Sequence, residues 1–203
     1  MQPELFYTGG MSTPEITLPA DLFPSDGRFG CGPSEVRPVQ IEAIDPAIVG
    51  TSHRQPAVKN LVGSVREGLS DLFSLPEGYE IVPSLGGATA FWDAATFGLI
   101  ERRSAHLTFG EFSTKFAKAA SKAPWLDAPA LTESPAGTAP DPRELAADAD
   151  VAAWAHNETS TGAMTEVVRP HPHNDQQLVL VDATSGAGGL PVNIAETDVY
   201  YFS

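Results

Sequence analysis

The chain has 203 residues, 42% of them hydrophobic and 19% charged, which is ordinary for a globular protein and enough for a substantial core. Its net charge of -14, from 12 basic and 26 acidic residues, would repel a polyanion, so nucleic acid is excluded as a partner. We predict a cytoplasmic protein that does not act at a membrane, because the chain has a single cysteine and no secretory pattern. It also has no apolar run near the ~18 residues that a membrane span needs.

The beginning of the chain has no regular pattern. Residues 1–30 contain Pro3, Pro14, Pro19 and Pro24 and keep no hydrophobic period, so an N-terminal arm is expected there. Residues 29–38, around Cys31, are typical of a turn that leads into a short helix at 37–43.

A polar cluster precedes the first long helix. From Pro56 to Phe73 the apolar residues keep a 3.6 period, and proline suits the first helical turn. His53 and Arg54 lie on the loop just before it. Arginine can hold a carboxylate or phosphate through two hydrogen bonds, so the pair is either a surface feature or an anion-binding site.

The next segment reads as strand, glycine turn and helix. Tyr79–Leu85 is predicted to be a strand and 90–100 a helix, with Gly86, Gly87, Ala88 and Thr89 between them. A helix that starts after a glycine turn presents backbone N–H groups to a phosphate. The motif lacks the features of ATP and dinucleotide sites, so neither of these ligands is favoured.

A second strand and helix follow. Residues 104–109 are predicted to form a strand, and Gly110 and Glu111 open a helix in which Phe112 either packs in the core or stacks on a flat ligand. The connecting segment after it has a short strand at 128–132 and a helical turn at 143–147.

Polar residues follow the next apolar strand, at 151–155. The segment from His156 to Gly162, which contains Thr159, either points hydrogen-bonding groups into a crevice at the end of that strand or caps its own turns. His171 and His173 are separated by a proline and lack a third ligand, so a solvated loop is predicted there and no metal site.

The last segment joins two predicted strands. The apolar residues 178–181 end at Asp182, and residues 198–203 form a further strand. Strands that alternate with helices predict an α/β fold with a largely parallel sheet. The polar residues at the strand ends are then expected at one edge of that sheet.

Five motifs in this order resemble the phosphoserine aminotransferase family. They are SHR at 52–54, GGATAFWDA at 86–94, GEFSTKF at 110–116, AHNETSTG at 155–162 and DATSGAGGLPV at 182–192. The resemblance covers 27–203. It implies a fold-type-I enzyme with pyridoxal 5'-phosphate (PLP) and a three-layer α/β/α cofactor domain. The family moves an amino group from L-glutamate to 3-phosphohydroxypyruvate, giving O-phospho-L-serine and 2-oxoglutarate in serine biosynthesis.

The resemblance also implies a role for each candidate residue. Asp182 would face the pyridine nitrogen of PLP, and Phe112 would stack on its ring, where many relatives have tryptophan. Thr159 would bind the phenolic oxygen of the cofactor. Gly87, Ala88 and Thr89 would hold its phosphate, and His53 and Arg54 the anionic groups of the substrate.

The Schiff-base lysine of the family has no counterpart in the chain, since none of its lysines lies in a matching motif. We therefore expect the N-terminal part of the enzyme: an arm at 1–30 and a truncated large domain at 31–203, without the small C-terminal domain. The resemblance implies a homodimer with active sites at the interface, and the chain alone is predicted to be inactive. Two alternatives stay open: another fold-type-I aminotransferase or a desulfurase, and a non-catalytic fragment that binds a phosphorylated ligand.

Overall fold

The computed structural model describes residues 17, 19–23, 35–170 and 176–203. They fall into two compact units, Met1–Ile41 and Glu42–Ser203. The first contains the 3-10 helix η1 (Ala20–Leu22) and most of α1 (Pro38–Glu42), which confirms the short helix expected at 37–43. Most of the predicted arm, the turn at Cys31 and the pair His171 and His173 lie outside the described residues.

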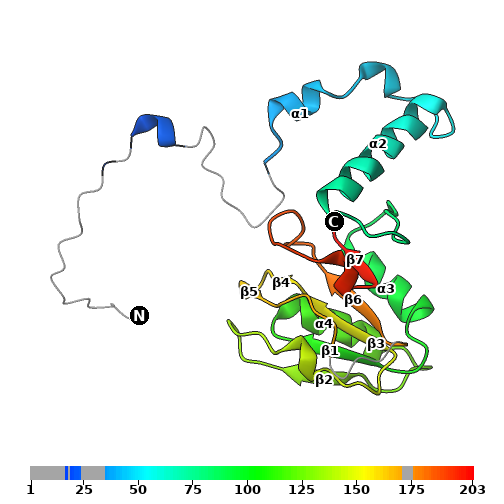
Figure 1. The fold of residues 1–203 in the computed structure, drawn as a ribbon, viewed down its shortest axis with the longest axis vertical. Coiled ribbons are helices and arrows are strands. Elements are labelled where there is room, and N and C mark those ends of the chain that lie inside the picture. The colour runs from blue at the N-terminus through cyan, green and yellow to red at the C-terminus, as the bar shows by residue number, and fades with distance from the viewer. Residues whose placement is uncertain (1–16, 18, 24–34, 171–175) are drawn as a thin grey trace, which may run out of the picture. The chain divides into compact units, whose positions relative to one another are not determined.

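A five-stranded parallel sheet forms the centre of the second unit (Figure 1), as the alternation of strands and helices predicted. Its strand order is β2-β1-β3-β6-β7. β1 and β3 are buried along their whole length, which explains the continuous apolar character of β3, whereas β1 also buries the polar residues Ser104, His106 and Thr108. The bounds of the strands are β1 Ser104–Thr108, β2 Ala130–Glu133, β3 Val151–Ala155, β6 Leu178–Asp182 and β7 Val199–Tyr201.

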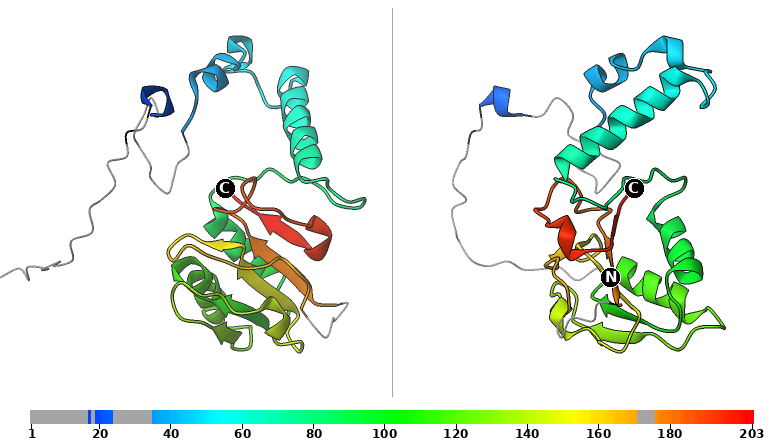
Figure 2. Two further views of the ribbon diagram at one scale, coloured as in Figure 1. Left: turned by 60° about the vertical axis from the view of Figure 1, so that its left-hand side comes forward. Right: turned by 45° about the vertical axis from the view of Figure 1, so that its right-hand side comes forward.

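Two helices cover one face of the sheet (Figure 2), α3 (Ala88–Gly98) and α4 (Glu111–Ser121). Trp92 and Phe116 are their largest buried side chains, and they pack on Val151 and Leu180 of the strands. Described residues on the opposite face form a second core cluster with the sheet, including Leu145, which directly follows the 3-10 helix η3 (Pro142–Glu144). The second unit is thus layered around this sheet.

The long helix α2 (Pro56–Leu72) matches the predicted helix and has proline in its first turn. It follows the 3-10 helix η2 (Pro46–Ile48). At its C-terminal end the ring of Phe73 lies 5.7 Å from those of Tyr200 and Phe202, so this end of α2 contacts β7. None of the helices that the structure describes is long and apolar enough to cross a bilayer.

The prediction of a strand at Tyr79–Leu85 is wrong. The segment has no regular secondary structure, and Val82 and Leu85 are 75% and 94% exposed. A strand needs a neighbour for its backbone hydrogen bonds, and no described strand pairs with this segment. Tyr79 instead donates its hydroxyl to the carbonyl of Thr197, at 2.6 Å.

Local differences occur in two further places. The segment after β3 is not only a loop: β4 (Asn157–Glu158) pairs with β5 (Ala163–Met164) in an antiparallel hairpin. Of the helical turn expected at 143–147 only the beginning is helical, in η3, which ends at Glu144, and a further 3-10 helix, η4 (Ile194–Glu196), precedes β7.

Candidate active site

The carboxyl ends of the parallel strands bring several of the predicted site residues to one edge of the sheet. Asp182 is the last residue of β6, and it is in register with Ala155 of β3 and Tyr201 of β7. Phe112 lies in the first turn of α4, directly after β1, and Thr159 follows β3. Such an edge is where ligands bind in open α/β sheets.

Asp182 is half-buried, and both of its carboxylate oxygens are oriented by neighbours. The backbone N–H of Thr184 donates to Oδ1 at 3.0 Å, and the indole Nε1 of Trp92 donates to Oδ2 at 3.3 Å. Each carboxylate oxygen can accept a further hydrogen bond. The residue is therefore able to receive a proton donor of a ligand, such as a protonated ring nitrogen.

Thr159 connects the segments that follow β3 and β6. Its hydroxyl donates to Oγ of Ser185 at 2.8 Å, and the amide of Asn157 donates to the same oxygen at 2.9 Å. The Ser185 hydroxyl in turn donates to the carbonyl of Asn157 at 3.0 Å. The two segments are thereby held together beside Asp182, and Ser185 is a contact that the sequence did not reveal.

Glu158 holds the N-terminus of α4 in place. It is fully buried, and its carboxylate accepts hydrogen bonds from the backbone N–H and hydroxyl of Ser113, both at 2.8 Å, and from the N–H of Phe112 at 3.3 Å. Ser160 donates its hydroxyl at 2.8 Å and its N–H at 3.3 Å. Burial raises the pKa of Glu158, but these hydrogen bonds outweigh it and hold the pKa below its usual value.

The ring of Phe112 is 41% exposed, so it does not belong to the core. Lys115 lies over this ring, with Nζ 5.4 Å from its centroid. The hydrogen bond from the N–H of Phe112 to Glu158 holds the backbone of this residue at the edge of the sheet. Glu158 was not identified from the sequence, because the helix start that it holds lies 45 positions away along the chain.

The start of α3 fits the expected phosphate site. Gly86 has φ 91°, a left-handed conformation that favours glycine, and Gly87 is the N-cap with no side-chain hydrogen bond to the helix. The first N–H groups of an α-helix have no partner within it, so those of Ala88 and Thr89 are suited to an anion. A Cβ built on Gly87 would lie 3.9 Å from Oγ of Ser203, which places this helix start beside the end of β7.

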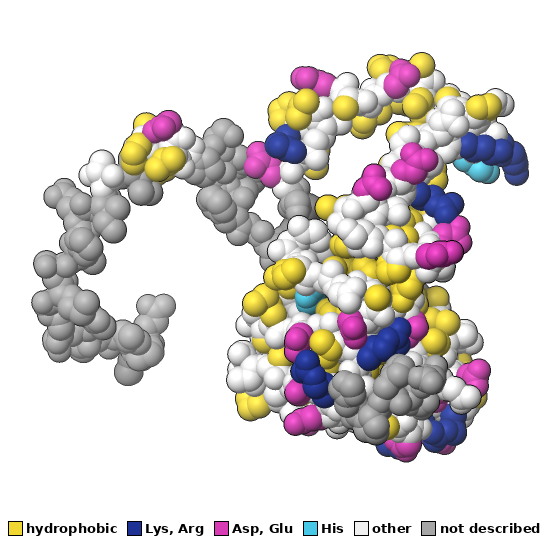
Figure 3. Space-filling model, in the orientation of Figure 1, with side chains coloured by type: hydrophobic (Ala, Val, Ile, Leu, Met, Phe, Trp, Pro, Cys, Tyr) yellow, Lys and Arg dark blue, Asp and Glu magenta, His cyan; other side chains and the backbone are white. Residues whose placement is uncertain are grey.

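His53 and Arg54 lie on the exposed loop before α2. In the part of the chain that the structure describes, no hydrogen bond or ion pair joins their side chains to Asp182, Phe112 or Thr159. Arg54 is also without an ion pair there, whereas five other arginines pair with carboxylates: Arg66, Arg102, Arg103, Arg143 and Arg169. Figure 3 shows such basic and acidic side chains next to one another on one face.

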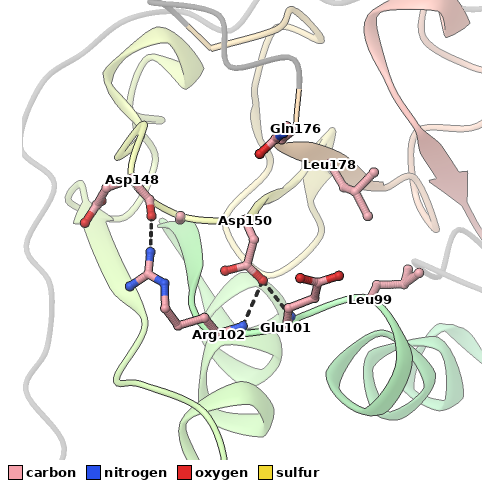
Figure 4. Close-up of a pocket in the computed structure, with 8 residues that line it drawn as sticks. Leu99, Glu101, Arg102, Asp148, Asp150, Gln176 and Leu178 are labelled. Carbon is pink, nitrogen blue, oxygen red and sulfur yellow. Dashed lines mark hydrogen bonds between the residues drawn. The ribbon is translucent and has the colours of Figure 1, made fainter.

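A hollow of about 600 Å³ lies at the opposite, amino-terminal edge of the strands (Figure 4). Its central acid is Asp150, whose carboxylate accepts the backbone N–H groups of Glu101, Arg102 and Arg103. Burial raises the pKa of Asp150, but these hydrogen bonds lower it by more, so the pKa lies below its usual value. The acid is thus engaged in joining the chain before β1 to the start of β3. No three His, Cys, Asp or Glu side chains of the described ranges are grouped to hold a metal ion.

Comparisons with known proteins give close relatives in sequence. A phosphoserine aminotransferase of Corynebacterium glutamicum (strain R) is 67% identical over 190 residues, which cover 92% of this chain and 50% of the relative. A putative phosphoserine aminotransferase of Mycobacterium avium (strain 104) is 58% identical over 192 residues, which cover 93% and 51%. The chain therefore spans about half the length of the curated relatives it matches. No family model matches the chain.

Solved structures agree with the sequence comparison. A phosphoserine aminotransferase from Cytophaga hutchinsonii superimposes with a TM-score of 0.71 at 27% identity, covering 80% of this chain and 46% of that one. An alanine–glyoxylate aminotransferase from Nostoc sp. has a TM-score of 0.67 at 21% identity, covering 92% and 51%, and shows the fold alone. The chain is thus a homologue of the phosphoserine aminotransferases, with part of the α/β domain of fold-type-I PLP aminotransferases.

Proposed function

We propose that this chain is the cofactor-binding half of a phosphoserine aminotransferase. The enzyme would transfer the amino group of L-glutamate to 3-phosphohydroxypyruvate, giving O-phospho-L-serine and 2-oxoglutarate. One observation carries the proposal: Asp182, Thr159, Phe112 and the open start of α3 meet at the carboxyl edge of one parallel sheet, in a chain 67% identical to a phosphoserine aminotransferase.

Each of these groups has the chemistry to hold PLP, which when bound supplies an electron sink for the substrate. Asp182 would accept the hydrogen bond of the pyridine nitrogen, and the exposed ring of Phe112 would stack on the pyridine ring. Thr159 would bind the phenolic oxygen. Gly87, Ala88 and Thr89 would hold the phosphate through backbone N–H groups, aided by the helix dipole, a contribution of ~0.3–1 kcal/mol.

Arg54 and His53 would bind the anionic groups of the substrate. The support is chemical, because the guanidinium of Arg54 forms no ion pair with any described carboxylate, whereas arginines elsewhere in the domain are paired. A planar guanidinium can hold a phosphate or carboxylate through two parallel hydrogen bonds. A local positive charge of this kind is needed to bind an anionic substrate in a chain with a net charge of -14.

The remaining assignments follow from the same likeness. Residues 31–203 would be the large domain and 1–30 an arm, and the lysine that binds PLP lies outside this chain. The small domain would come from the rest of the enzyme, and two subunits would complete the active sites at their interface. The chain alone would then lack transaminase activity, because covalent binding and proton transfer need that lysine.

The test requires an enzyme with the missing half. We define the completed enzyme as this chain joined to the part of the Corynebacterium glutamicum relative that lies beyond the matched region. It should produce O-phospho-L-serine from L-glutamate and 3-phosphohydroxypyruvate, and Asp182→Asn should remove most of this activity. A completed enzyme that folds and transfers amino groups only to unphosphorylated acceptors, such as pyruvate or glyoxylate, would contradict the substrate assignment.

A further inference from the structure

Behind Asp182 the structure places two aromatic side chains with polar atoms, Trp92 of α3 and Tyr201 of β7. They are 5% and 8% exposed. The indole Nε1 of Trp92 lies 3.1 Å from the Tyr201 hydroxyl and 3.3 Å from Oδ2 of Asp182, so its N–H is shared between the two oxygens. The three groups form a buried network that reaches the exposed edge only through the carboxylate.

The direction of each hydrogen bond in this network follows from the groups themselves. An indole N–H can only donate, and an ionised carboxylate can only accept. The Tyr201 hydroxyl therefore accepts from Trp92, and its own proton is attracted by the nearby charge of Asp182. Burial, and next the charge of Asp182, raise the pKa of Tyr201 well above its usual value, so the phenol keeps its proton.

Packing allows neither ring to move away. Trp92 stacks on Phe116, with ring centroids 6.0 Å apart and an interplanar angle of 10°, and Phe91 lies 4.0 Å from the ring of Tyr201. The backbone is fixed as well, because Asp182 and Tyr201 are register partners and the N–H of Ala183 donates to the carbonyl of Tyr201 at 2.8 Å. The donors are thus preorganised.

We infer that Trp92 and Tyr201 are positioning residues, which hold the carboxylate of Asp182 in the orientation that the ring nitrogen of the cofactor requires. The inference rests on the proposed function and goes beyond it, since it assigns a role to two residues that do not contact the cofactor. A carboxylate held in this orientation is in line to accept the hydrogen bond of the ring nitrogen, which favours the protonated form of that nitrogen.

The experiment uses the completed enzyme loaded with PLP that is labelled with ¹⁵N in the ring. Trp92→Phe and Tyr201→Phe each remove one polar atom and keep the ring. We expect the ¹⁵N chemical shift to report a smaller protonated fraction of the ring nitrogen in both variants. Loss of one hydrogen bond to a charged group should also weaken PLP binding about tenfold and lower kcat by a similar factor, with KM for 3-phosphohydroxypyruvate nearly unchanged.

Two matched variants control for the loss of an aromatic polar group. Trp125 is 52% exposed and packs on Phe97, and Tyr79 donates its hydroxyl to Thr197. Trp125→Phe and Tyr79→Phe should leave the ¹⁵N shift unchanged.

The inference is overturned if Trp92→Phe and Tyr201→Phe fold and show the wild-type ¹⁵N shift, or if the controls change it equally. Should one variant not fold, the other still decides. Failure of the wild-type enzyme to bind PLP would refute the proposed function instead, so the two failures are distinguishable.

Discussion

Glu158→Gln tests the role of the buried acid that fixes the start of α4. Glutamine has nearly the same shape, but its NH₂ group is a donor where the carboxylate accepts. If NH₂ replaces Oε2, the Ser113 hydroxyl can rotate and accept, whereas the backbone N–H of Ser113, 2.8 Å away, is left unpaired. An unpaired buried donor costs about 1–3 kcal/mol, and the other hydrogen bonds lose their charge assistance. The expected loss of unfolding free energy is therefore about 2–4 kcal/mol.

Denaturant unfolding measures this loss, with Glu144→Gln as the control because Glu144 is exposed and the change in charge is the same. The control should stay within about 0.5 kcal/mol of the wild type.

The pKa of Glu158 is lowered from 4.5 in the folded protein, so its stabilisation is present above pH 4.5 and is lost as the pH falls through the folded value. The stability gap between wild type and Glu158→Gln should narrow in this acidic range. The reasoning is refuted if Glu158→Gln equals the control at neutral pH, or if the gap does not change on acidification.

Three further predictions concern packing, pH and substrate binding. Gly110→Ala should destabilise by about 1–3 kcal/mol or more, since its Cβ would lie 2.3 Å from Cγ of Glu158, whereas Gly63→Ala has open space and should not; denaturant unfolding compares them. Burial lowers the pKa of His106 from 6.5 to about 3, so below pH 6.5 the unfolded state binds a proton that the folded state does not. The free energy of unfolding should therefore fall as the pH drops below 6.5, by up to ~1.4 kcal/mol per pH unit, and His106→Gln should lose this pH dependence in an unfolding series. In the completed enzyme Arg54→Gln should raise KM for 3-phosphohydroxypyruvate about tenfold or more, with Lys59→Gln as the unaffected control in steady-state kinetics.

Most of the fold could be predicted because its signals are local. β3 and β6 are short apolar runs, as expected for parallel strands buried on both faces, and α2 follows the helical period from its proline. Asp182 and the polar segment that contains Thr159 drew attention by their position after such strands. The segment at Tyr79–Leu85 has a suitable local pattern too, but its state depends on a pairing partner, which the pattern does not contain.

The supports of the site could not be predicted, because they join residues that are distant in sequence. Glu158 accepts a hydrogen bond at the start of α4 from a residue 45 positions away in the sequence, and Trp92 and Asp182, which are also hydrogen-bonded, are 90 positions apart. These contacts arise only once the strand order and register are known. Local chemistry therefore indicated which groups could contact a ligand, whereas the residues that orient them became visible in the three-dimensional structure.

The most direct test of the proposed function is an absorbance spectrum with PLP, recorded before and after addition of L-glutamate, for the 203-residue chain and for the completed enzyme. We predict that the completed enzyme shows a cofactor band that glutamate bleaches, and that the 203-residue chain shows none. If the completed enzyme is folded and binds no PLP, the cofactor assignment of Asp182, Phe112 and Thr159 is contradicted.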